Sequence, residues 1–99
     1  MIERVEFNPN AQQEVVESFD WYESSEVGLG DDFLASIDHC IRLIRSHPEM
    51  FPIAFKNYRK ALLTRFPFVV FYRVSVSTLT IYAVFHCSKN PMRLTKRLA

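Results

Sequence analysis

The spacing of apolar residues changes near the middle of the chain, and this change limits the fold more than any other feature. Between residues 11 and 44 the apolar side chains recur every three or four positions, as they do along one side of a helix. From residue 58 onward they form a continuous run or alternate with polar residues, as they do in strands. A block of helices followed by a block of strands is typical of an α+β fold, in which helices pack against an antiparallel sheet.

The first half begins with a short strand and a helix. The alternation over residues 2–7 predicts the strand. Asn8 and Pro9 indicate a helix start, because Asn can cap free backbone N–H groups and Pro is tolerated in the first turn. The helix is predicted over about residues 10–26, with an apolar stripe formed by Ala11, Val15, Phe19 and Tyr22. Acidic residues recur on its other side and are interpreted as a solvated face: Glu14, Glu17, Asp20, Glu23 and Glu26.

A second helix is expected to pair with the first. Gly28 and Gly30 allow a tight turn between the two, and the second helix then runs to about His47, before Pro48. Its apolar stripe, which we expect to pack on the sheet, consists of Phe33, Ile37, Cys40, Ile41 and Ile44. Two amphipathic helices joined by a short turn form a helical hairpin.

The second half predicts three strands followed by a basic tail. The strands are expected at residues 58–64, 66–72 and 79–86, with a polar connection between the last two. Leu62 and Leu63 are the expected buried residues of the first of these strands. In the last strand, the residues expected to share the face under the helices are Leu79, Ile81, Ala83 and Phe85.

Charge is divided between the two halves of the sequence. Residues 1–49 contain all eleven Asp and Glu residues but only three Arg, which gives a balance of −8. Residues 50–99 contain no Asp or Glu and nine Lys and Arg, a balance of +9. Such a concentration of positive charge favours binding to a polyanion or to an acidic protein.

Length and composition indicate one domain, over residues 1–99, in the cytoplasm. The start of the chain lacks the features of a secretory signal, and the apolar stretch from Phe66 to Tyr72 is too short to span a membrane. Cys40 and Cys87 lack metal-ligand spacing and suit a reduced cytosolic protein. We therefore expect no metal, no cofactor and no membrane partner.

Several short segments, taken in order, resemble one known family. They are Arg59, Leu62-Leu63, Arg65-Phe66-Pro67-Phe68, Tyr72-Arg73-Val74, Ile81-Tyr82-Ala83-Val84-Phe85-His86, Lys89-Asn90-Pro91 and Arg97, with Ala11, Trp21-Tyr22, Gly28-Leu29-Gly30 and Phe33 earlier in the chain. Together they are similar to toxins of the RelE/ParE superfamily, which belong to type II toxin–antitoxin systems. The Arg-Phe-Pro-Phe strand and the His-x-x-Lys-Asn-Pro segment resemble the ParE-like, plasmid-stabilisation branch.

The resemblance implies a fold, a partner and two alternative targets. The fold is an N-terminal strand and a helical hairpin packed on a curved antiparallel β-sheet, and the partner is an acidic antitoxin in a hetero-oligomer. ParE-like members are associated with inhibition of DNA gyrase, whereas RelE-like members cut messenger RNA on the ribosome. Growth inhibition is implied in both cases.

The sequence leaves open whether the chain is an enzyme. RNA cleavage needs proton-transfer groups and cations, and His86 is the one histidine of the basic half. The RNase hypothesis therefore rests on His86 with Arg65, Arg73 or Arg93, and with Tyr82 on the same strand face. A structural role for His86 is the alternative.

We interpret the chain as a toxin that acts by binding a protein, with a RelE-like endoribonuclease as the alternative and a basic nucleic-acid-binding domain as a third possibility. The basic residues would then contact the antitoxin or the target, or be solvated. The candidate binding residues are Arg59, Arg65, Arg73, Lys89, Arg93, Lys96 and Arg97.

Overall fold

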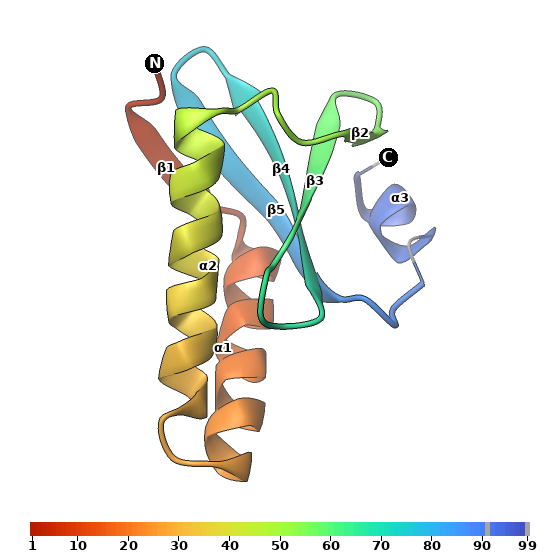
Figure 1. Cartoon of the computed structure of the whole chain (residues 1–99). Coiled ribbons are helices and arrows are strands. Elements are labelled where there is room, and N and C mark those ends of the chain that lie inside the picture. Colours follow the sequence, from red (N-terminus) through yellow and green to blue (C-terminus); the bar gives the residue numbers. More distant parts are fainter. Residues whose placement is uncertain (91, 99) are drawn as a thin grey trace.

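The computed structural model describes residues 1–90 and 92–98, which form three helices and five strands (Figure 1). In chain order these are β1 (Arg4–Phe7), α1 (Pro9–Ser25), α2 (Leu29–Ser46), β2 (Ile53–Phe55), β3 (Tyr58–Leu62), β4 (Phe68–Ser75), β5 (Thr78–His86) and α3 (Met92–Leu98). The predicted α+β fold with an N-terminal strand and a helical hairpin is confirmed. The short β2 strand was not predicted, and the basic tail forms a helix.

The five strands form one sheet in the order β1-β5-β4-β3-β2. β2 to β5 pair antiparallel, whereas β1 pairs parallel with β5. β2 to β5 thus form the expected antiparallel sheet, and β1 adds a parallel pair at one edge. The helical hairpin lies between β1 and the remaining strands in the sequence, and it provides the long crossover that parallel pairing requires.

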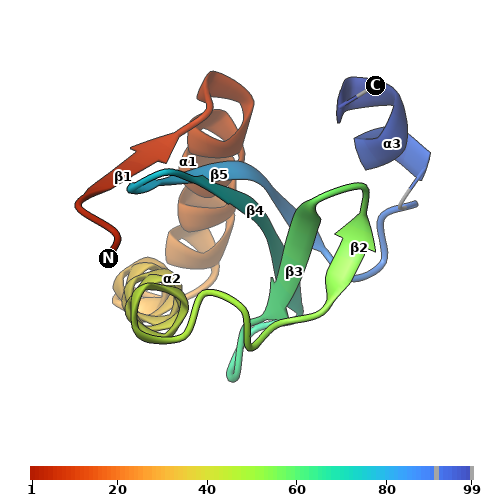
Figure 2. The same cartoon turned by 90° about the horizontal axis from the view of Figure 1, so that it is seen from above.

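Helices cover both faces of the sheet. α1 and α2 pack on one face around a core that includes Phe33, Ile44, Tyr72 and Leu79, each fully buried. On the other face, Leu94 of α3 packs against a smaller cluster formed by Phe71, Ala83 and Phe85. Figure 2 shows the strongly twisted sheet between the two long helices and α3.

Local sequence signals set the ends of the helices. The side chain of Asn8 accepts a hydrogen bond from the backbone N–H of Asn10, and Pro9 is the first residue of α1. The carboxylate of Glu23 accepts hydrogen bonds from the backbone N–H groups of Gly28 and Gly30, and so fixes the turn into α2. The interpretation of Glu23 as part of a solvated face is therefore wrong.

A bulge in β5 reverses the expected orientation of its second half. Phe71 is paired with Ala83, but the next residue, Tyr72, is paired with Ile81, so Tyr82 is an extra residue in β5. Leu79 and Ile81 face α1 and α2 as expected. Ala83 and Phe85 face α3 instead, so the expectation that all four share one face is wrong.

Two other burial expectations change in the structure. Leu62 is 64% exposed while Leu63 is buried, because neighbouring residues of an extended chain point in opposite directions. Ile41 is only partly buried, although it packs against the core, whereas Ile44 is fully buried. The stripe of α2 that faces the sheet is thus centred on Phe33, Ile37 and Ile44.

Candidate partner-binding surface

The sheet face opposite α1 and α2 carries a group of basic, aromatic and apolar side chains, which we call the outer face: Tyr58, Lys60, Leu62, Arg73 and Tyr82. Alternation in β3 brings Tyr58, Lys60 and Leu62 to the same side. Arg73 also faces outward, because it follows Tyr72 in β4 and the Tyr72 side chain faces the core. Tyr82 completes the group, because it follows Ile81 in β5 and Ile81 faces the core on the other side.

Two tyrosine rings hold the guanidinium of Arg73. Its central carbon lies 5.2 Å from the ring centroid of Tyr58 and 5.4 Å from that of Tyr82. The Nη2 of Arg73 donates a hydrogen bond of 3.1 Å to the hydroxyl of Tyr82. These contacts orient a positive group that carries five N–H donors, a suitable arrangement for binding a carboxylate or a phosphate.

Arg59 faces the other way and has a structural contact. Its Nη1 donates to the backbone carbonyls of Phe51, at 2.7 Å, and Glu49, at 3.3 Å. The side chain therefore anchors the segment between α2 and β2. The predicted role of Arg59 in partner binding stays a prediction.

The remaining candidate cations lie at the margins of the sheet. Arg65 lies in the connection between β3 and β4, 3.7 Å from a carboxylate oxygen of Asp32. Lys89 lies over the ring of Phe85, with its Nζ 5.6 Å from the centroid. Arg93 and Lys96 are exposed on α3.

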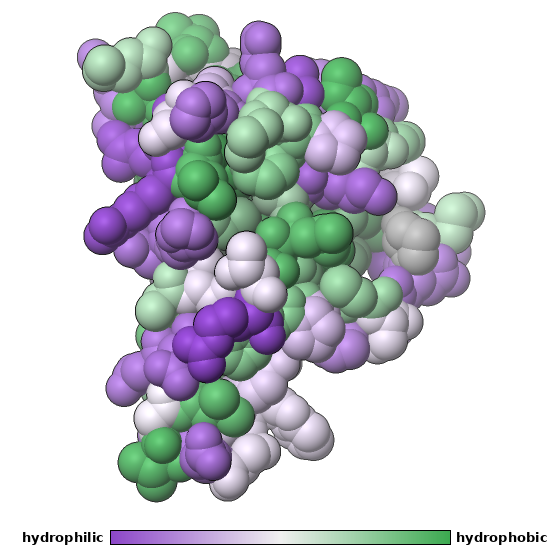
Figure 3. All heavy atoms as spheres, in the orientation of Figure 1, coloured by the Kyte–Doolittle hydropathy of each residue, from purple (hydrophilic) through white to green (hydrophobic). Residues whose placement is uncertain are grey.

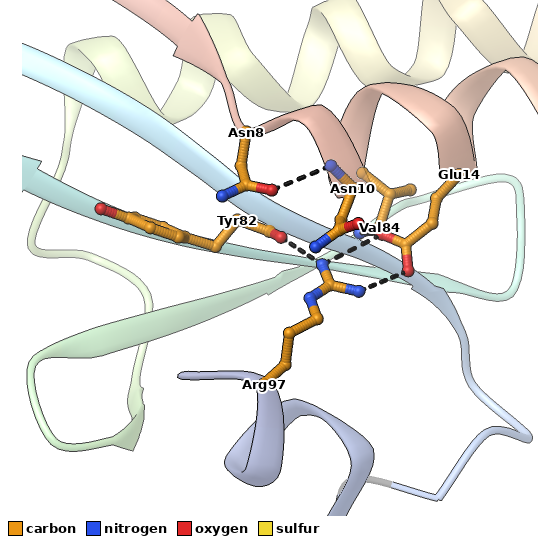
Figure 4. Close-up of polar contacts among 6 residues, drawn as sticks. All are labelled: Asn8, Asn10, Glu14, Tyr82, Val84 and Arg97. Carbon is orange, nitrogen blue, oxygen red and sulfur yellow. Dashed lines mark hydrogen bonds and ion pairs between the residues drawn. The ribbon is translucent and has the colours of Figure 1, made fainter. Parts of the chain in front are cut away.

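Arg97 takes part in an internal network with Glu14 (Figure 4). Its Nη1 donates to Glu14 Oε2 at 2.9 Å, and its Nη2 donates to the backbone carbonyl of Tyr82. Glu14 Oε1 accepts a further bond of 2.9 Å from the N–H of Val84. β1 ends opposite Ile81. Beyond Ile81, Glu14 and Arg97 therefore take the place of a neighbouring strand and hydrogen-bond to the backbone of β5. The interpretation of Glu14 as solvated is therefore wrong.

His86 lies on the helix-facing side of β5, away from Arg73 and Tyr82. Its ring makes an edge contact with Phe68, with centroids 5.3 Å apart, and its Nδ1 accepts a hydrogen bond from the N–H of Ser88. The ring borders a cleft that is also lined by Glu17 and Lys89. The expectation that His86 and Tyr82 share a strand face is therefore wrong, because the bulge lies between them.

Sequence reasoning overlooked four residues of this region: Glu14, Tyr58, Lys60 and Leu62. The alternation of Tyr58, Lys60 and Leu62 in the sequence is a signal that could have placed them on one face. Glu14 carries no comparable signal, because its partners belong to the distant β5 and α3. The catalytic and binding roles of the candidate residues stay predictions.

The described part of the chain has neither a metal-binding cluster nor a helix that could span a membrane. Within residues 1–90 and 92–98, no group of three or more His, Cys, Asp and Glu side chains could hold a metal ion. Over the same ranges, every helix is too short or too polar to cross a membrane.

Comparisons with known proteins agree with this architecture. Residues 5–91 match the family described as the ParE toxin of the type II toxin–antitoxin system, parDE. The chain is also similar to a solved structure described as the chromosomal ParDE TA system from P. aeruginosa, with a TM-score of 0.63 and 15% identity over 87% of this chain and 96% of that one. A search of curated proteins gave no match. Since the family match spans most of the sequence, the chain belongs to the ParE toxin family of type II toxin–antitoxin systems.

Proposed function

We propose that residues 1–99 form one toxin domain that binds a cytoplasmic protein such as DNA gyrase and is neutralised by an acidic antitoxin. The observation that carries this proposal is the outer face, which presents an oriented arginine and an exposed leucine on the same side of the sheet. Arg73 and Lys60 supply positive charge, and Leu62, which is 64% exposed, supplies an apolar anchor. Membership of a toxin–antitoxin family implies an antitoxin partner.

The charge distribution supports an acidic partner at this surface. Residues 50–99, which include β3 to β5 and α3, contain no Asp or Glu, and Glu14 is the acidic residue that reaches α3. Positive charge on the outer face would speed the encounter with an acidic antitoxin. Burial of Leu62 and of the partly exposed Tyr82 ring would contribute most of the affinity, because apolar and aromatic anchors dominate stable interfaces.

The separation of His86 from Arg73 favours binding over RNA cleavage. A proton-transfer imidazole must lie within hydrogen-bond reach of the proton that it moves. His86 faces α1 and packs against Phe68, whereas Arg73 and Tyr82 face the opposite side of the sheet. These side chains therefore do not line a common site.

The RelE-like endoribonuclease remains a second candidate on one observation. Nη2 of Arg73 and the hydroxyl of Tyr82 are 3.1 Å apart on the outer face, which also carries Lys60. Cations near a hydroxyl could stabilise the phosphate of an RNA chain during cleavage. In that case the cleavage site would consist of outer-face residues, without His86.

The neutralisation proposal is tested with the product of the neighbouring gene. We expect the two proteins to co-purify, and we expect Lys60→Glu and Arg73→Glu to weaken the complex by about tenfold or more. Arg42→Glu is the matched control, because Arg42 is exposed on α2 and pairs with Asp38 at 3.0 Å. A chain that stays monomeric and harmless without a partner would contradict the proposal, as would equal losses in all three variants.

A further inference from the structure

An apolar groove runs along the helical hairpin, across the sheet from the outer face. It consists of two adjoining cavities of about 460 and 320 Å³, which share Val15 and Val16. Phe7 of β1 lies at one end, and Phe19 and Leu34 lie at the other. The groove therefore joins β1, α1 and α2 along a continuous apolar surface.

The apolar side chains of this groove are unusually accessible. Val16 is 51% exposed and Leu34 is 39% exposed, although each lies on a helix whose other side packs in the core. Figure 3 shows further hydrophobic surface at the lower end of the hairpin, where Val27 is 90% exposed. A connected apolar patch at the surface of a small protein is typical of an interaction site.

Negative charge surrounds the groove. Asp20 contributes to its lining, and Asp31 and Asp38 lie one turn before and one turn after Leu34 on α2. All three aspartates are exposed, and Arg42 lies next to Asp38. Apart from Arg42, the cations near the hairpin lie away from the groove lining: Arg45 at the end of α2, Arg65 paired with Asp32, Arg97 paired with Glu14, and Lys89 in the cleft beside Glu17. The groove thus combines an apolar floor with an acidic rim, the reverse of the outer face in charge.

We infer that this groove binds an amphipathic helix of a partner protein, with apolar residues on one side and Lys or Arg along its flanks. Residues of such a helix at positions i, i+3 or i+4 and i+7 would contact Val15, Val16 and Leu34. Its basic flanks would face the aspartates of the rim, while acidic flanks would be repelled. The interaction is independent of the outer face, so the toxin has two binding surfaces of opposite charge.

The experiment uses the full chain and two synthetic helical peptides of about 18 residues, or five turns. Both peptides carry the same Leu and Ile face, and their flanks are Lys in one and Glu in the other. We expect the Lys peptide to bind, measured by fluorescence anisotropy, and the Glu peptide to bind at least tenfold more weakly. Equal affinities of the two peptides, or no binding of the Lys peptide, would overturn the inference.

Variants locate the binding in the groove. Val16→Gln and Leu34→Gln should weaken binding of the Lys peptide by about tenfold each. Val27→Gln is the matched control, since it removes an exposed apolar side chain in the hairpin turn outside the groove, and its affinity should equal that of the parent. Asp31→Lys should lower the affinity of the Lys peptide and raise the affinity of the Glu peptide. Unchanged affinity in Val16→Gln and Leu34→Gln, with circular dichroism confirming folded protein, would place the peptide elsewhere and reject the inference.

Discussion

At the scale of single residues, Glu14 connects three elements that are distant in the sequence. It lies in α1, accepts a hydrogen bond from the backbone of β5 and forms an ion pair with Arg97 of α3. The side chains of Glu14 and Arg97 are only 14% and 24% exposed. Solvent screens such a pair poorly, and the Val84 N–H has no strand partner on this side of β5. Glu14 therefore contributes more to the stability of the fold than a surface carboxylate would.

The first prediction concerns this pair. Glu14→Ala should lower the free energy of unfolding by about 2–4 kcal/mol, because the Val84 N–H and the Arg97 guanidinium lose their acceptor. A double-mutant cycle with Arg97→Ala should give a coupling of about 1 kcal/mol or more in urea denaturation. The control pair Asp38 and Arg42, which is well exposed, should give less than about 0.5 kcal/mol. Equal coupling in both pairs would show that the buried network is unimportant for stability.

The second prediction concerns backbone strain at Val76. This residue has a φ of 55° in the two-residue turn between β4 and β5, and its side chain is 99% exposed. A β-branched residue is strained in this conformation, whereas glycine is not. Val76→Gly should therefore raise the free energy of unfolding by about 1 kcal/mol. The control is Ser77→Gly, at the neighbouring position without a positive φ, which should lower the free energy of unfolding. A loss of stability in both variants would refute the assignment of strain to Val76.

At the scale of elements, the sequence predicts the helices better than it predicts the last strand. The α2 stripe of Phe33, Ile37 and Ile44 is correct because helical periodicity alone decides which side is apolar. The bulge at Tyr82 could not be predicted, because residues 81–85 are all apolar or aromatic and an extra residue leaves no mark in such a run. The bulge places Tyr82 and His86 on opposite faces of the sheet and so changes the composition of the candidate site.

The third prediction tests the orientation of α2. Ile44→Ala should cost about 3–4 kcal/mol, because Ile44 is fully buried between α2 and the sheet. Ile41→Ala should cost about 1–2 kcal/mol, because Ile41 is only partly buried at the edge of the same core. Both values come from urea denaturation of the purified chain. A larger loss for Ile41 than for Ile44 would mean that α2 is rotated relative to this structure.

At the scale of the whole molecule, the two halves of the sequence present surfaces of opposite charge. The helical hairpin carries the acidic groove, and the sheet carries the basic outer face. In the core between the hairpin and the sheet, burial raises the pKa of the Cys40 thiol to about 11 and that of the Tyr72 hydroxyl to about 12. Arg59 opposes the shift of Tyr72, and burial is the larger cause.

The fourth prediction follows from these two groups. Their ordinary pKa values are 9.0 for Cys40 and 10.0 for Tyr72, so the unfolded chain loses these protons at a lower pH than the folded chain does. The stability that these two groups contribute should therefore be fully present below about pH 9. Between about pH 9 and pH 12 the free energy of unfolding should fall by at most about 1.4 kcal/mol per pH unit for each group. Urea denaturation across this range measures the slope. Cys40→Ala should flatten it between about pH 9 and pH 11, and an unchanged slope would contradict the assignment.

The proposal that the toxin acts by binding is tested most directly by mapping transcript ends during growth arrest. Cells would express the parent chain or His86→Gln at matched levels, without the antitoxin, and DNA supercoiling would be followed in the same cultures. We expect both proteins to arrest growth and to alter supercoiling, with no new messenger RNA ends, because His86 lies across the sheet from Arg73 and outside the proposed binding face. New ribosome-dependent transcript ends in the parent, with unchanged supercoiling, would contradict the account and establish the endoribonuclease.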